Sequence, residues 1–86
     1  MKISWSPFHS TYDETTVKRY ASSEDGIYLL WVKLKEGKKW RCFYVGQARN
    51  LEARLLQHLS SKEDNDCLRK KLANNVCGFE YAKVGR

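Results

Sequence analysis

Residues 26–45 of the chain, GIYLLWVKLKEGKKWRCFYV, decide its fold. Residues 26–34 are rich in aliphatic, aromatic and β-branched side chains, which predicts a strand buried on both faces. Residues 35–39 are polar and contain a glycine, which is typical of a turn. Residues 40–45 predict a second strand, and the short connection between the two strands indicates an antiparallel hairpin.

The residues after the hairpin predict two helices and a third strand. The first helix covers residues 50–60, the second residues 65–74, and the strand residues 78–84. The apolar stripe of the first helix consists of Leu51, Leu55, Leu56 and Leu59. The order β-β-α-α-β predicts an α+β fold, in which helices pack against a small sheet.

Length and composition indicate one domain. A chain of 86 residues with 42% hydrophobic and 30% charged residues supports one modest core and excludes a disordered tail. We expect residues 1–25, with a short helix near residues 13–20, to form a lead-in that packs on a core of residues 26–86. No apolar run approaches the ~20 residues of a membrane helix and no signal peptide is evident, so we expect no membrane partner.

The charge favours a polyanionic partner. Sixteen Lys and Arg against ten Asp and Glu give a net charge of +6, which attracts nucleic acid, although small proteins are also basic for solubility. The residues that we expect to contact the nucleic-acid backbone are Lys33, Lys35, Lys38, Lys39, Arg41 and Arg49.

The cysteines argue against two classes of small protein. Cys42, Cys67 and Cys77 are odd in number and form no C-x-x-C pair, so a secreted disulfide scaffold and a zinc knuckle are both poorly supported. We interpret them as small buried residues in a reducing compartment, and therefore expect a cytoplasmic protein.

A group of polar residues suits phosphodiester chemistry. Asn50, Arg54 and His58 are spaced i, i+4, i+8 and predict one polar row on the first helix, directly after Gly46, where we expect a sharp turn. Arg54 offers a planar set of donors that matches a phosphate. Strand tyrosines Tyr28 and Tyr44 can position water, but a phenol with a pKa of ~10 needs a cation nearby to act as a base. Taken alone, each residue is more typical of packing or of a solvated surface than of catalysis, and only the joint pattern favours a site.

Taken together, the motifs resemble those of the GIY-YIG nuclease superfamily. The resemblance rests on Gly26-Ile27-Tyr28, on Tyr44-Val45-Gly46, and on Gln47-Ala48-Arg49-Asn50-Leu51 followed by Arg54. It implies a three-stranded antiparallel sheet flanked by helices and hydrolysis of DNA phosphodiester bonds with a single Mg²⁺ or Mn²⁺, without a small-molecule cofactor.

The resemblance also implies roles for single residues. Tyr28 is the general base or the group that positions water, and Tyr44 orients the water or the phosphate. Arg54 stabilises the pentacovalent phosphate, and His58 stands where members place His or Tyr. Gln47 occupies a position where several members carry lysine, so the positive charge that would acidify the tyrosine is missing there.

The metal-binding glutamate that the resemblance implies has no clear counterpart in this sequence. The metal-binding glutamate of the family sits on a helix after the third strand, whereas Glu80 lies within that strand, in what we expect to be a solvent-facing position. We expect the core to be truncated at its C-terminus and this chain to bind DNA weakly and cleave it poorly; a genuinely minimal relative is the alternative. The rival functions are a non-catalytic nucleic-acid-binding module on the same fold and a protein-interaction scaffold.

Overall fold

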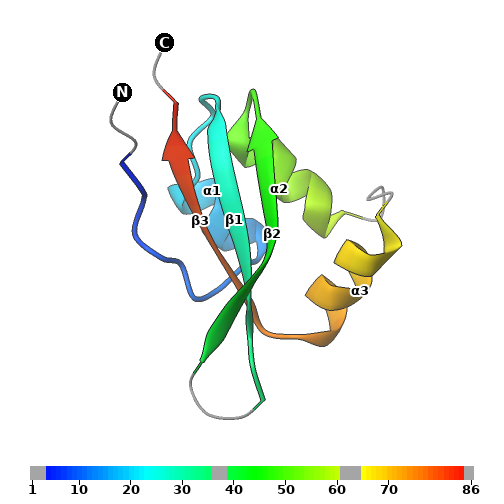
Figure 1. Ribbon diagram of the computed structural model, residues 1–86. Coiled ribbons are helices and arrows are strands. Elements are labelled where there is room, and N and C mark those ends of the chain that lie inside the picture. The colour runs from blue at the N-terminus through cyan, green and yellow to red at the C-terminus, as the bar shows by residue number, and fades with distance from the viewer. Residues whose placement is uncertain (1–3, 36–38, 61–64, 85–86) are drawn as a thin grey trace.

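An antiparallel sheet forms the centre of the chain. The structure, a computed structural model, describes residues 4–35, 39–60 and 65–84. In these ranges the elements are α1 (Glu14–Tyr20), β1 (Gly26–Lys33), β2 (Trp40–Ala48), α2 (Leu51–Leu59), α3 (Asp66–Asn74) and β3 (Cys77–Lys83) (Figure 1). Strand β1 lies between β2 and β3 and is antiparallel to both. The predicted α+β class and the antiparallel sheet are confirmed, and no helix in the described ranges is long and apolar enough to cross a membrane.

Each helix begins directly after a capping side chain. The carboxylate of Asp13 accepts a hydrogen bond from the backbone N–H of Thr16 at 2.7 Å, which caps α1. Asn50 caps α2 through Ala53, and Asn65 caps α3 in the same way. A short polar side chain at this position satisfies one of the helix N–H groups that has no partner within the helix. These caps place each helix within about a residue of its predicted start.

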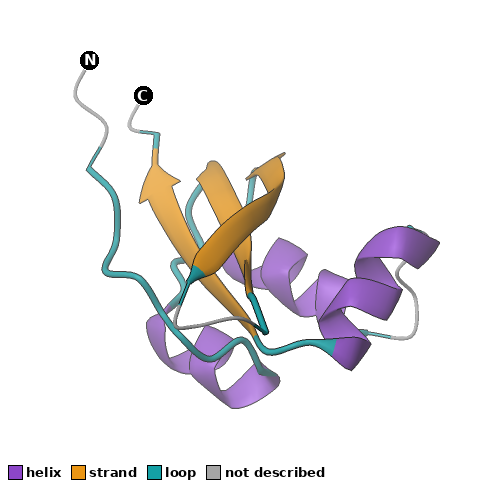
Figure 2. Cartoon of the chain, turned by 60° about the horizontal axis from the view of Figure 1, so that its bottom comes forward, coloured by secondary structure: helices purple, strands orange, loops and turns teal. Residues whose placement is uncertain are grey.

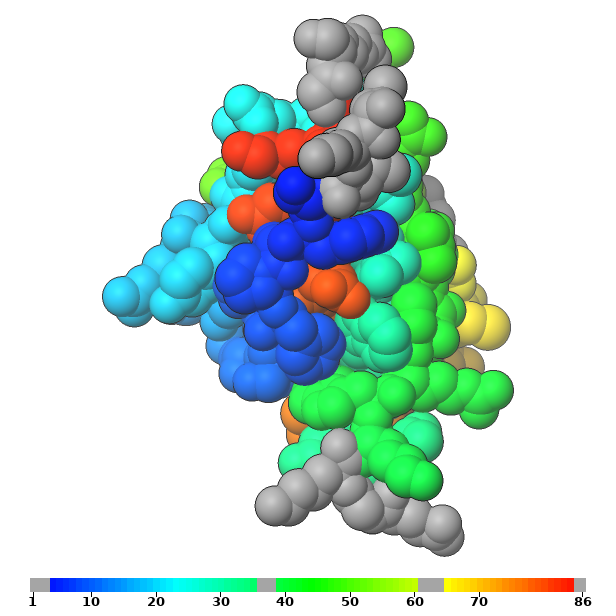
Figure 3. All heavy atoms as spheres, turned by 60° about the vertical axis from the view of Figure 1, so that its left-hand side comes forward, coloured from blue at the N-terminus to red at the C-terminus, as the bar shows by residue number. Residues whose placement is uncertain are grey.

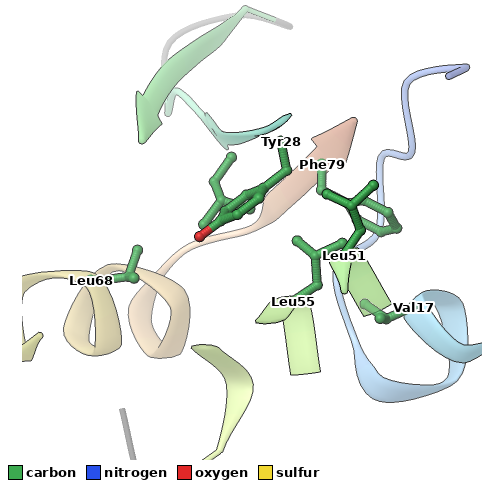
Figure 4. Packing of buried hydrophobic residues seen from close by; sticks show 7 residues of the cluster. Val17, Tyr28, Leu51, Leu55, Leu68 and Phe79 are labelled. Atoms are coloured by element: carbon green, nitrogen blue, oxygen red, sulfur yellow. The ribbon is translucent and has the colours of Figure 1, made fainter. Parts of the chain in front are cut away.

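The helices of the described chain pack on one face of the sheet (Figure 2). As a result, burial alternates along β1: Tyr28, Leu30 and Val32 face the helices and are buried, while the residues between them are partly exposed. The prediction of a strand buried on both faces is therefore wrong, because the opposite face carries no helix. Figure 4 shows the helix-side core, in which the other labelled side chains are Val17, Leu51, Leu55, Leu68 and Phe79.

Strand β2 is longer than its apolar run predicts. It continues through Gly46 to Ala48, because these residues keep pairing with Gly26–Tyr28 of β1. Its register shifts once: Leu30 pairs with Tyr44 and Trp31 with Cys42, so the residue between them is an extra residue, a β-bulge. The predicted sharp turn at Gly46 is wrong, since β2 continues to Ala48 and the chain turns into α2 at residues 49–50.

The N-terminal segment covers the outer edge of β3. Single β-bridges join Trp5 to Ala82 and His9 to Phe79, and the N–H of Ser6 donates to the carbonyl of Tyr81 at 2.7 Å. In Figure 3 this segment, in dark blue, lies directly against the orange and red residues of β3. The backbone groups along this edge of the sheet are thereby paired rather than left open.

Candidate active site

The first part of the site is a contact between the two tyrosine-containing motifs. Tyr28 of β1 lies opposite Gly46 of β2, and a Cβ built on Gly46 would overlap the ring and hydroxyl of Tyr28. The ring of Tyr28 thus occupies the space of the missing side chain. Gly46 is required for this close approach, which brings residues 26–28 and 44–46 into direct contact.

A buried hydrogen bond connects Tyr28 to α2. The Tyr28 hydroxyl lies 2.6 Å from Nε2 of His58, and the two side chains are 0% and 1% exposed. Figure 4 shows that the hydroxyl points away from Leu51 and Phe79, toward the side of α3. Tyr44 completes this group, with its ring centre 6.0 Å from that of Tyr28 and 5.4 Å from that of His58.

Arg54 lies at the entrance to the group. Its half-buried guanidinium donates hydrogen bonds to the hydroxyls of both Tyr28 and Tyr44. These two interactions raise the pKa of Arg54 further above its ordinary value, so the group stays positively charged. The structure therefore brings together four residues that the sequence predicted as one site, namely Tyr28, Tyr44, Arg54 and His58.

The protonation of Tyr28 is set mainly by its burial. Removal from water raises the pKa of Tyr28 to about 12, although the hydrogen bond from Arg54 opposes this shift. At neutral pH the phenol is therefore neutral, and its hydroxyl shares a hydrogen bond with Nε2 of His58 while its oxygen accepts from Arg54. A neutral phenol with no exposed surface is suited to holding Arg54 in place, and poorly suited to taking a proton from water.

The prediction that Asn50, Arg54 and His58 form one polar row on α2 is wrong. Asn50 lies before the helix and caps it, Arg54 is half-buried, and His58 is fully buried against Tyr28. The reason is the angle between residues on a helix: positions i, i+4 and i+8 drift toward the leucine stripe, which faces the core. The leucine stripe next to His58 was therefore the sequence feature that could have predicted the burial of this residue.

A polar recess opens beside Arg54 at the junction of β2 and α2. It has a volume of about 370 Å³, and its polar lining residues are Gln47, Arg49, Asn50, Arg54 and Gln57. Two guanidinium groups and three amides are groups that bind an anion such as a phosphate. Of the other motif residues, Ile27 and Val45 alternate onto the outer face of the sheet, and Val45 is 64% exposed. Gly26 is buried where a Cβ would meet Leu51 and Ala82.

The basic residues of the hairpin are exposed, as a surface for nucleic acid requires. This applies to Lys33, Lys35, Lys39, Arg41 and, at the other end of β2, Arg49. Lys38 lies outside the described residues. These exposed basic side chains therefore lie at the two ends of β2, near the hairpin and beside the recess at Arg54.

The carboxylates near the sheet do not complete a metal site. Within residues 4–35, 39–60 and 65–84, no group of three His, Cys, Asp or Glu side chains is placed to hold an ion. Glu80 pairs with Leu29, so it lies on the face of the sheet opposite Tyr28, where it accepts a hydrogen bond from Nε1 of Trp31 at 3.0 Å. The expectation that Glu80 faces solvent is wrong, because Trp31 partly covers it. Phenols, an imidazole and a guanidinium do not fit Mg²⁺, which prefers carboxylate oxygens, so we assign it no ligand here.

The cysteines differ from one another in exposure. All three are free thiols, but Cys77 is buried, Cys42 is partly buried and Cys67 is exposed. The interpretation of all three as buried residues is therefore wrong for Cys67, which lies exposed in the first turn of α3. Burial raises the pKa of the Cys77 thiol, so this group remains protonated at neutral pH.

Comparison with known proteins adds no family to this description. No family model matches the chain, and neither a curated protein nor a solved structure matches it.

Proposed function

We propose that this chain is a GIY-YIG-type endonuclease domain that hydrolyses DNA phosphodiester bonds with the help of Mg²⁺ or Mn²⁺. The observation that carries the proposal is the buried hydrogen bond between Tyr28 and His58, which lies directly behind Arg54 and Tyr44. A buried polar pair costs free energy unless it is satisfied, and this pair is satisfied by groups that also suit a phosphate site.

Within this proposal, the residues divide by exposure. Arg54 and Tyr44, which are half-buried, contact the phosphate: the guanidinium neutralises the charge that develops on it, and the Tyr44 hydroxyl orients the attacking water. Tyr28 and His58 are fully buried and act as positioning residues that hold Arg54 and Tyr44. The resemblance gives Tyr28 the role of general base or of a group that positions water, and its full burial and raised pKa favour neither of these.

The described residues form no ligand set for the divalent ion, so none of them is assigned a role in holding it. The cytoplasm is the compartment we propose, since the three cysteines are free and a nuclease acting on cellular DNA meets its substrate there.

A second candidate, a non-catalytic nucleic-acid-binding module, is favoured by one observation. The described residues around Arg54 and Tyr44 supply cations, amides and phenols but no carboxylate, which suits binding of a phosphate without its hydrolysis. The exposed basic residues at the two ends of β2 serve both candidates equally.

Nicking of supercoiled plasmid separates the two candidates. We expect the chain to convert supercoiled to open-circular DNA with Mg²⁺ or Mn²⁺ and to stop when EDTA is added. Arg54→Ala should abolish nicking while leaving the circular dichroism spectrum unchanged. Arg19→Ala, which removes an exposed guanidinium from α1, is the matched control and should retain nicking.

Other outcomes identify the alternatives. Nicking that persists in Arg54→Ala would refute the assigned role of this residue. Salt-sensitive binding without product by the wild-type chain would establish the binding module in place of the nuclease. Absence of any DNA affinity would overturn both and leave a protein-interaction scaffold.

A further inference from the structure

The β-bulge in β2 brings two neighbouring aromatic residues to the same side of the sheet. In a regular strand, successive side chains point to opposite faces. Here Phe43 is the extra residue between the Leu30–Tyr44 and Trp31–Cys42 pairs, and both Phe43 and Tyr44 pack against the helix-side core. Bulges frequently re-aim a side chain next to an active site, and this one adds a second ring beside Tyr44.

These two rings form one wall of a pocket against α3. The pocket has a volume of about 230 Å³ and is lined by Phe43, Tyr44, Asn65, Cys67, Leu68 and Lys71. The ammonium group of Lys71 lies over the Phe43 ring, 5.9 Å from its centre. Lys71 is exposed, so its flexible side chain can leave the ring and pair with an anion at the pocket mouth.

The pocket and the phosphate site share Tyr44. This residue contacts Arg54 and His58, and it also lines the pocket. Arg54 in turn lines the polar recess that contains Arg49 and Gln47. Recess and pocket are therefore connected through the neighbouring residues Arg54 and Tyr44, which suits successive groups of a single nucleic-acid strand.

We propose that this pocket binds an unpaired nucleobase of the strand whose phosphate lies at Arg54. The inference rests on the proposed function and deepens it, because it makes the substrate a DNA with an unpaired base next to the target phosphate, such as a flap, a gap or a frayed end. Aromatic faces bind bases of any sequence by stacking, and Lys71 supplies the charge for the neighbouring phosphate. A base inside an intact duplex is stacked on both faces and cannot enter such a pocket without being flipped out.

Binding of matched DNA probes tests this inference. The probes are a blunt duplex, the same duplex with one strand extended by a few nucleotides, and the extended strand alone, each without divalent metal. We expect the wild-type chain to bind the two probes with unpaired bases about tenfold more tightly than the blunt duplex at the same salt concentration. A 2-aminopurine placed at the first unpaired position should lose fluorescence on binding, because it stacks on an aromatic ring.

Two variants and a control separate stacking from loss of fold or charge. Phe43→Leu keeps an apolar side chain and removes the aromatic face, so it should remove both the preference and the fluorescence change while thermal unfolding shows that the fold is kept. Lys71→Gln should weaken binding of the extended probe about threefold. Lys70→Gln makes the same change of charge one residue earlier on α3, outside the pocket, and should keep the preference.

The contrary results are equally definite. Equal affinity of the wild-type chain for all probes, or an unchanged preference in folded Phe43→Leu, would overturn the inference. Release of the 2-aminopurine probe by free dAMP at the affinity of the oligonucleotide would show a site for a free nucleotide and would overturn its link to the strand. Nicking by a chain that shows no preference for unpaired bases would refute this inference alone. Failure of all probes to bind would refute the proposed function as well.

Discussion

The ring of Tyr28 lies directly on the backbone of Gly46, in the space that a side chain at residue 46 would fill. This contact joins the two motifs that give the chain its resemblance to GIY-YIG nucleases. It also fixes where the Tyr28 hydroxyl ends, which is 2.6 Å from Nε2 of His58. The glycine of the second motif is therefore a packing requirement of the tyrosine in the first.

Replacing Gly46 by alanine should destabilise the fold by about 1–3 kcal/mol, because the new methyl group overlaps the buried Tyr28 ring. Urea unfolding measures the change. Val45→Ala is the matched control: the side chain is 64% exposed on the other face, so the effect should stay within about 0.5 kcal/mol. In a Tyr28→Leu background, whose shorter side chain leaves room, Gly46→Ala should cost clearly less; an unchanged cost would contradict the proposed contact.

Tyr28→Phe should lower the free energy of unfolding by about 1–3 kcal/mol, because it leaves the buried Nε2 of His58 without its hydroxyl partner. Tyr81→Phe is the comparison, since it removes a hydrogen bond of similar length to the carbonyl of Tyr20 at an exposed site. We expect that control to change stability by about 0.5 kcal/mol or less. Equal costs for the two variants would show that the Tyr28–His58 bond has no special weight.

The stability of the chain should fall at alkaline pH partly through Tyr28. Its pKa in the folded state is about 12, above the ordinary value of 10.0, so folding favours the neutral phenol. That contribution is complete below pH ~10 and is lost as the pH rises toward ~12. Urea unfolding across this range should show a steeper decline for the wild-type chain than for Tyr28→Phe. Parallel declines would mean that other groups account for the whole effect.

The exposed lysines near the hairpin should set the salt dependence of DNA binding. Replacing both Lys35 and Lys39 by glutamine removes two expected phosphate contacts, so the slope of log K against log salt should become shallower by about 2. Anisotropy of a labelled duplex at several salt concentrations measures the slope. Lys18, which pairs with Glu14 on α1 at 2.7 Å, is the control, and Lys18→Gln should leave the slope nearly unchanged. Equal slopes for all three proteins would place the DNA on another surface.

Local patterns predicted most of the elements within a residue or two. Asp13, Asn50 and Asn65 mark helix starts because their side chains satisfy backbone N–H groups that any helix leaves free. The end of β2 was missed because Gly46, Gln47 and Ala48 are weak strand formers, and their pairing with β1 depends on the contact with Tyr28. Strand propensity alone therefore cannot predict that β2 extends to Ala48.

The candidate site divides in the same way. The spacing of Arg54 after Tyr44 and the identity of Tyr28 and His58 are properties of the sequence, and they were enough to nominate the site. Three features of the site were not predicted from the sequence: the burial of His58, the placement of Glu80 on the opposite face and the bulge at Phe43. Each depends on how strands and helices from distant parts of the chain pair and pack.

The sequence by itself determined most of the elements and the residue types of the site, since these follow from residue identity and from patterns a few positions long. The tertiary structure decided what those residues can do. Packing of α2 on one face of the sheet buried the Tyr28–His58 pair, raised the pKa of Tyr28 and left Arg54 and Tyr44 as the groups that can reach a phosphate. Desolvation depends on neighbours from distant parts of the chain, which become defined only when the sheet and helices have packed together.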